Sequence, residues 1–84
     1  QGGWLDYGMF LQSLMIAARA RGLDTCPQAA FTQFHRIIAQ HLGLDERRET
    51  VVCGMSLGWA DPAAVENTLV TERAPVAEFA RFLD

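Results

Sequence analysis

The fold of this 84-residue chain is decided by one stretch, Met9-Phe10-Leu11-Gln12-Ser13-Leu14-Met15-Ile16-Ala17-Ala18. Its apolar side chains go almost all the way round a helix, which predicts a helix that is buried on every side. We expect this helix to run from Asp6, as its N-cap, to Arg21, with Gly22 as its C-terminal stop. A chain this short cannot cover such a helix alone, so a second wall must come from another chain or from a further part of the protein.

Two further elements are expected after this helix. A second, amphipathic helix is predicted from Gln28 to Leu42, with Pro27 in its first turn. The segment Thr50–Leu57 is the one convincing strand, and its apolar start predicts an interior strand. Because one strand cannot form a sheet, we expect its partner to come from outside this chain or from a dimer. The tail 76–84 is predicted to be a short helix or an arm that docks elsewhere.

Composition limits the possible functions. Half of the residues are hydrophobic. The chain has seven Arg, no Lys and ten acidic residues, which gives a net charge of −3. We expect no nucleic-acid partner, because no basic face offsets phosphate repulsion. No apolar run reaches the roughly 20 residues that span a bilayer, so we expect no membrane partner. Two cysteines are too few for a disulfide scaffold, which favours reduced thiols and a cytoplasmic location.

One short motif invites an enzymatic interpretation. The segment Gly54-Met55-Ser56-Leu57-Gly58 matches the G-x-S-x-G nucleophile elbow of serine hydrolases. Pro62 opposes the helix that should follow, and both His35 and His41 precede the serine, whereas the hydrolase order places histidine after it. The other interpretation is a strand whose glycines permit close backbone approach. The two histidines lie six residues apart, so they do not share a helical face as metal ligands, and we expect no metal site.

Two other segments could bind a ligand. At Pro27-Gln28-Ala29-Ala30, free N–H groups at a helix start could donate to an acceptor, and small side chains would let a flat ligand approach the backbone. The alternative is that the alanines are simply good helix formers. Arg73 lies in a loop and could clamp a phosphate, or it could be solvated or paired with a neighbour. Residue type alone does not choose between these interpretations.

Taken in order, several segments resemble the C-terminal half of the FMN-dependent nitroreductase family. The resemblance is carried by Trp4–Gly8, Gln12, Ala17–Ala29, Val51–Pro62, Asn67 and Thr71–Val76. It implies an α+β fold in which residues 1–84 form a single partial domain. It also implies an intertwined homodimer around the long buried helix, with C-terminal arms crossing onto the partner subunit and two FMN molecules at the interface.

The resemblance further implies a function. NAD(P)H would reduce FMN and leave, and a nitroaromatic, a quinone or a free flavin would then take the electrons in a ping-pong reaction. The segment Pro27, Gln28, Ala29 and Ala30 would contact the flavin near N5, and Arg73 would bind the FMN phosphate. No catalytic acid or base is assigned in this segment.

The sequence departs from the family pattern in three ways. Many members carry a glycine or an acidic residue near Ala29-Ala30, and a lysine where this chain has Thr71. The family's N-terminal half, which supplies further flavin contacts, is not part of this sequence. The alternative function is therefore a non-catalytic dimerisation or interaction remnant of the family that no longer binds flavin.

Overall fold

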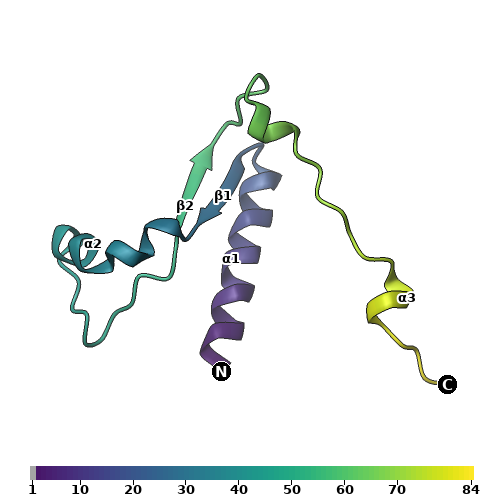
Figure 1. The fold of residues 1–84 in the computed structure, drawn as a ribbon, viewed down its shortest axis with the longest axis horizontal. Coiled ribbons are helices and arrows are strands. Elements are labelled where there is room, and N and C mark those ends of the chain that lie inside the picture. Colours follow the sequence, from purple (N-terminus) through teal and green to yellow (C-terminus); the bar gives the residue numbers. More distant parts are fainter. Residues whose placement is uncertain (1) are drawn as a thin grey trace.

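The structure is a computed structural model that describes residues 2–84. It is a small α+β arrangement of three α-helices and one two-stranded antiparallel sheet (Figure 1). The elements follow in the order α1 (Gly2–Ala20), β1 (Asp24–Gln28), a 3-10 helix (Ala30–Phe34), α2 (His35–Leu42), β2 (Gly54–Gly58), a second 3-10 helix (Val65–Thr68) and α3 (Val76–Phe79). None of the described helices is long and apolar enough to cross a membrane.

Helix α1 ends close to where the sequence predicts. Gly22 takes a left-handed conformation with φ of 76°, and the N–H of Leu23 donates to the carbonyl of Ala18 at 3.0 Å. The predicted N-cap at Asp6 is wrong, because α1 extends back to Gly2 and Asp6 lies inside it. Once a helix has formed, adding a residue costs far less than starting one, so low-propensity residues ahead of the apolar run can still be helical.

Strand β1 is the main departure from the predicted fold. It pairs antiparallel with β2 in a register from Asp24 opposite Gly58 to Gln28 opposite Gly54. The partner of the predicted strand therefore lies within this chain, and the prediction of an external partner was wrong. Within residues 2–84 each strand of this two-stranded sheet is an edge, so an interior position for β2 stays a prediction. An edge is where a strand tolerates proline, which explains how Pro27 is accommodated.

Asp24 joins three parts of the chain at the start of β1. Its Oδ1 accepts a hydrogen bond from Nη1 of Arg19, in the last turn of α1, at 2.6 Å. Its Oδ2 accepts from the backbone N–H of Ala60, just after β2, at 3.1 Å. These contacts fix where α1 leads into the sheet.

The second helix starts later than predicted. Pro27 and Gln28 belong to β1, so their backbone is extended, and the chain turns through the 3-10 helix before α2 begins at His35. Helix α2 buries Ala39 and ends at Gly43, which has φ of 69°. The N–H of Leu44 donates to the Ala39 carbonyl at 2.8 Å, so α2 ends in the same way as α1.

The described residues bury very little apolar surface. Among residues 2–84, Ala18 and Ala39 are the only buried residues, while Trp4, Phe10 and Ile16 of α1 are each 60% exposed or more. The rest of this chain therefore does not bury α1 as predicted. That a second copy or a further part of the protein covers α1 stays a prediction.

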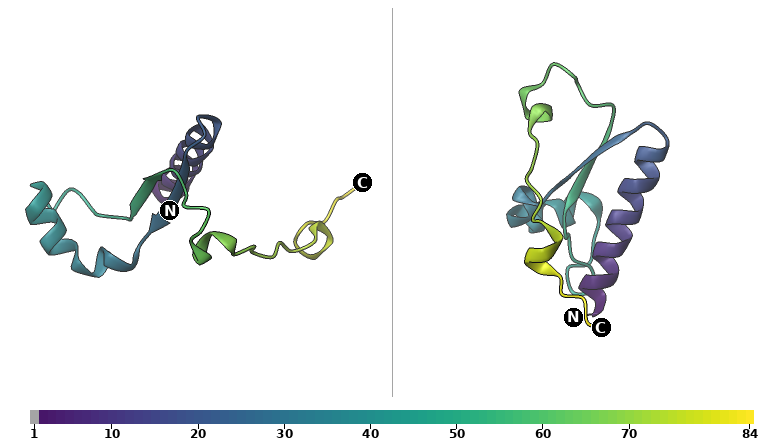
Figure 2. Two further views of the ribbon diagram at one scale, coloured as in Figure 1. Left: turned by 90° about the horizontal axis from the view of Figure 1, so that it is seen from above. Right: turned by 90° about the vertical axis from the view of Figure 1, so that its right-hand side faces the viewer.

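The C-terminal tail is an extended arm that contains one short helix. Beyond the second 3-10 helix the chain is extended, forms α3, and is extended again at Ala80. Figure 1 and the left view of Figure 2 show this tail and α2 reaching away from the sheet in opposite directions. The molecule measures 51 × 41 × 24 Å along its principal axes. Docking of the tail onto a partner stays a prediction.

Candidate functional site

The end of β1 presents free backbone donors. Gln28, Ala29 and Ala30 are all exposed. The carbonyl of Ala29 accepts from the N–H of Thr32 at 3.0 Å and from its Oγ1 at 2.6 Å. Within residues 2–84, the N–H groups of Ala29 and Ala30 make no backbone hydrogen bond outside the strands and helices. The predicted donor segment is therefore exposed, and it lies where β1 ends at Gln28 and the 3-10 helix begins at Ala30, two residues after the predicted helix start.

The side chain of Gln28 is held from the neighbouring strand. Ser56 in β2 donates its hydroxyl hydrogen to Oε1 of Gln28, with Oγ and Oε1 3.1 Å apart. Ser56 lies in the middle of β2 and not on a strand-to-helix turn, and its partner is an amide and not an imidazole. The nucleophile-elbow interpretation therefore fails on geometry, as the sequence predicts.

The first glycine of the same motif makes room for an aromatic ring. A β-carbon on Gly54 would lie within 3.2 Å of both Cε1 and Cε2 of Phe31 and closer still to Cζ. Real β-carbons do not approach a ring so closely, so only glycine fits beneath Phe31 without a shift. The close approach that the sequence suggests for these glycines occurs at Gly54, while a β-carbon on Gly58 would meet open space.

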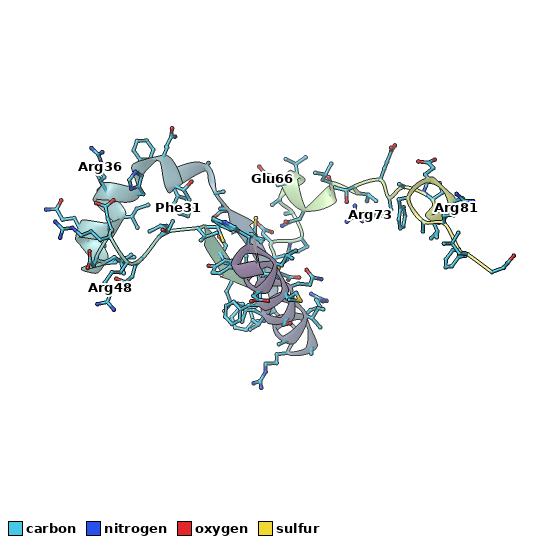
Figure 3. All side chains as sticks on the ribbon, turned by 90° about the horizontal axis from the view of Figure 1, so that it is seen from below. Phe31, Arg36, Arg48, Glu66, Arg73 and Arg81 are labelled. Carbon is cyan, nitrogen blue, oxygen red and sulfur yellow. The ribbon has the colours of Figure 1, made fainter. Side chains whose placement is uncertain are left out.

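Arg73 lies on the outstretched tail, apart from the end of β1. Its Nη1 donates to Oγ1 of Thr71 at 2.5 Å and to the carbonyl of Glu72 at 3.0 Å. Figure 3 shows Arg73 on the side of the sheet opposite Phe31, which lies in the 3-10 helix just after β1. Pro27, Gln28, Ala29 and Ala30 are consecutive in the sequence and so lie together. Arg73, the other predicted site residue, does not lie beside them in the structure.

One exposed ion pair lies beside α2. His35 on α2 pairs with Glu46 through Nδ1 and Oε1 at 2.7 Å, with both side chains about half exposed. They line an open cavity of about 370 Å³ between α2 and the loop that follows it. No group of three or more His, Cys, Asp or Glu side chains in residues 2–84 could hold a metal ion. Cys26 and Cys53 are free thiols.

The chemistry of these donors can be tested against a flavin. The reactive edge of an isoalloxazine ring offers acceptors, and the N–H groups of Ala29 and Ala30 are matching neutral donors on small residues. This half of the predicted site fits the group. The phosphate half is represented by Arg73, whose guanidinium is chemically suited but points into its own loop. In a single chain, the donors for the ring at Ala29 and Ala30 and the cation for the phosphate at Arg73 therefore lie apart.

Sequence comparison identifies the family of this chain. The model of the Nitroreductase family matches residues 1–59. The chain belongs to the nitroreductase family.

Curated relatives agree with this placement. The chain is 51% identical over 80 residues to a 4-nitrobenzoate reductase from Pseudomonas putida, 44% to a chloronitrobenzene nitroreductase from Comamonas testosteroni and 43% to a nitrobenzene nitroreductase from Ectopseudomonas oleovorans. Each match covers 95% of this chain and 35% of the relative. The chain therefore spans about a third of the length of these relatives.

Proposed function

We propose that this chain is the C-terminal part of an FMN-dependent NAD(P)H oxidoreductase of nitroreductase type. Such an enzyme reduces nitroaromatics, quinones or flavins by ping-pong hydride transfer. The observation that carries the proposal is the family match over residues 1–59. The names of three relatives, each a reductase of a nitroaromatic compound, support the choice of acceptor.

The end of β1 is proposed to hold the flavin ring. Among residues 2–84, the N–H groups of Ala29 and Ala30 make no backbone hydrogen bond outside the strands and helices, and both residues are exposed. Their methyl side chains leave the backbone open to a flat ligand. Pro27 and Gln28 fix the approach to this point by pairing with Met55 and Gly54 across the sheet. When bound, FMN supplies the redox chemistry, and the chain's own residues bind and orient it.

Arg73 is proposed to bind the FMN phosphate. Its guanidinium has two partners on its own loop, and both are neutral oxygens, of Thr71 and Glu72. A phosphate dianion is a far stronger partner for guanidinium than a hydroxyl or a carbonyl. Arg73 can therefore exchange these contacts for a phosphate, provided that the tail lies against the ring site in the assembled enzyme.

The assembled enzyme is proposed to be a homodimer located in the cytoplasm. The apolar side chains of α1 are exposed along its length in one chain, and a second copy together with its C-terminal arm would cover them. Its small-molecule partners are NAD(P)H and an aromatic electron acceptor, and neither nucleic acid nor membrane is a proposed partner. Residues 1–84 are one partial domain of this enzyme.

One observation favours the second candidate function, a non-catalytic dimerisation or interaction remnant. Arg73 is turned into its own loop and lies apart from Phe31, which belongs to the 3-10 helix that begins at Ala30, so one chain does not assemble both halves of an FMN site. A remnant would keep the apolar faces that drive association and lose flavin binding.

An activity assay separates the two functions. The purified chain is mixed with FMN, NADH or NADPH and 4-nitrobenzoate, and consumption of the nicotinamide is followed against a mixture without protein. The enzyme proposal predicts consumption that requires protein, FMN and acceptor together. Rates equal to the protein-free mixture contradict it and support the remnant.

A further inference from the structure

The tail that carries Arg73 leaves the sheet through one corner, the segment 60–68 that follows β2 (Figure 1). Just beyond the corner, Leu69 and Val70 are 77% and 89% exposed, and residues 69–74 hydrogen-bond only to one another among residues 2–84. In the part of the chain that the structure describes, the corner therefore sets the direction of the tail. Because Arg73 lies six residues beyond Asn67, up to about 20 Å along an extended chain, a small turn at the corner moves its guanidinium far.

Asp24 ties the first residue of the corner to the rest of the structure. Its Oδ2 accepts from the backbone N–H of Ala60 at 3.1 Å, and its Oδ1 accepts from Nη1 of Arg19 at 2.6 Å. Asp24 is also the first residue of β1, opposite Gly58 in the register of the sheet. The corner thus starts at a point to which α1, β1 and β2 are all joined.

Asn67 closes the other end of the corner. Its Nδ2 donates to the carbonyl of Asp61, six residues back, at 2.7 Å, and this carbonyl also accepts from the N–H of Ala64 at 3.2 Å. The backbone N–H of Asn67 donates to the Ala64 carbonyl at 3.1 Å, so both its side chain and its backbone are held. Residues 61–67 therefore form one closed loop, and the tail begins directly after it.

The two ends of the corner lie close to each other. Asp24, Ala60 and Asn67 all line one open cavity of about 290 Å³ at the end of the sheet. We infer that Asp24 and Asn67 are positioning residues that fix the direction in which the tail leaves the sheet, and that they thereby position Arg73. The inference deepens the proposed function, and its part that concerns Arg73 rests on that function. A tail that is ordered before it meets a partner subunit loses less conformational entropy on docking.

Paired spin labels test the direction of the tail without flavin. Cys26 and Cys53 are first replaced by serine. Labels are then attached at Ser13→Cys on α1 and at Ala74→Cys on the tail, both at exposed positions. Double electron–electron resonance gives the distribution of distances between the labels, and an excess of unlabelled chain keeps each dimer to one labelled copy.

The width of this distribution decides the first part of the inference. We expect a narrow distribution for the wild-type corner and broader ones for Asn67→Ala, Asn67→Asp and Asp24→Ala. Asn67→Asp keeps the size of the side chain and loses its donor. Glu66→Gln changes the neighbouring exposed side chain and should leave the distribution narrow. A broad distribution in the wild type, or a narrow one in Asn67→Ala or Asp24→Ala, overturns the inference.

The FMN dissociation constant, measured by flavin fluorescence, tests the role toward Arg73. Asn67→Ala should weaken binding about threefold to tenfold, less than Arg73→Ala, because the guanidinium remains and only its placement is lost. In an Arg73→Ala background, Asn67→Ala should have no further effect, because there is no guanidinium left to position. Glu66→Gln should leave the dissociation constant unchanged in both backgrounds.

The outcomes separate the inference from the function on which it rests. If the wild type binds FMN and Asn67→Ala binds equally well, or weakens binding further in the Arg73→Ala background, the inference is wrong and the proposed function stands. If the wild type does not bind FMN, the proposed function is wrong and the role toward Arg73 falls with it, while the spin labels still decide what fixes the tail.

Discussion

The ring of Phe31 lies over Gly54, so the 3-10 helix that follows β1 packs onto the strand that pairs with β1. The space beneath the ring admits a hydrogen and not a methyl group. This contact explains the first glycine of the G-x-S-x-G motif by packing, with no nucleophile involved. It also fixes the direction in which the chain leaves the strand end at Ala29.

Gly54→Ala should destabilise the chain. The added methyl group would push the Phe31 ring off the strand, and because the ring is 37% exposed and can move, we expect the low end of the overpacking cost, about 1 kcal/mol. Urea unfolding followed by circular dichroism measures the loss. Gly58→Ala is the matched control on the same strand, because a β-carbon there meets open space. Equal unfolding free energies for the two variants would show that Phe31 does not occupy this position.

Gly43→Ala should also destabilise the chain, for a different reason. Gly43 ends α2 with φ of 69°, a left-handed conformation that costs an L-residue roughly 1 kcal/mol. Gly8 lies inside α1 with open space around it, so Gly8→Ala should instead stabilise the helix by up to about 1 kcal/mol. Thermal unfolding of both variants checks the opposite signs, and a shift of both midpoints in the same direction would refute this account of the α2 end.

Arg73→Ala should weaken FMN binding. Hydrogen bonds to charged groups contribute about 1.5–3 kcal/mol, so we expect the dissociation constant to rise roughly tenfold to a hundredfold. Equilibrium titration by flavin fluorescence gives the value. Arg81→Ala removes another exposed arginine from the same tail and should leave binding unchanged. Equal dissociation constants for Arg73→Ala and the wild type would remove Arg73 from the proposed site.

Leu14→Asp should prevent self-association. Leu14 lies on α1 and is 43% exposed in one chain, and the proposed dimer buries it, so an aspartate there would leave an unpaired buried charge. Sedimentation velocity should show an oligomer for the wild type and a monomer for the variant. Gln40→Asp places the same charge at an exposed polar position of α2 and should remain oligomeric. A monomeric wild type contradicts the proposed dimer.

The helices could be predicted from the sequence because their information is local. The apolar run around Leu14 fixes α1, and Gly22 and Gly43 mark helix ends that need a left-handed residue. The length of α1 could not be predicted equally well, because its first turn contains glycines and lacks an obvious cap. Periodicity identifies a helix more reliably than its first residue.

Strand β1 could not be predicted in the same way, because its stability comes from pairing with residues far along the chain. Asp24 and Pro27 both disfavour strands, so local preference indicates a loop. Asp24 is nevertheless used as a hydrogen-bond acceptor for α1 and for the turn after β2, and Pro27 is tolerated at an edge. The Thr25-Cys26 pair is the only local hint of a strand.

The candidate site was predicted only in part. The small residues Ala29 and Ala30 predict an accessible backbone, and among residues 2–84 their N–H groups have no backbone partner outside the strands and helices. The contact between Ser56 and Gln28 depends on the register of the sheet and could not be found before β1 was known. Arg73 could not be placed from the sequence because it lies on the extended tail, and in the proposed dimer the path of that tail sets its distance from Ala29 and Ala30.

The central claim is that this chain contributes an FMN site, and the visible absorption spectrum of the purified chain tests it most directly. The spectrum is recorded before FMN is added and again after the mixture has passed through a desalting column. We predict a retained flavin spectrum, which is weaker in Arg73→Ala than in Arg81→Ala. A colourless eluate from the wild type would contradict the claim and identify the chain as a structural remnant of the nitroreductase family.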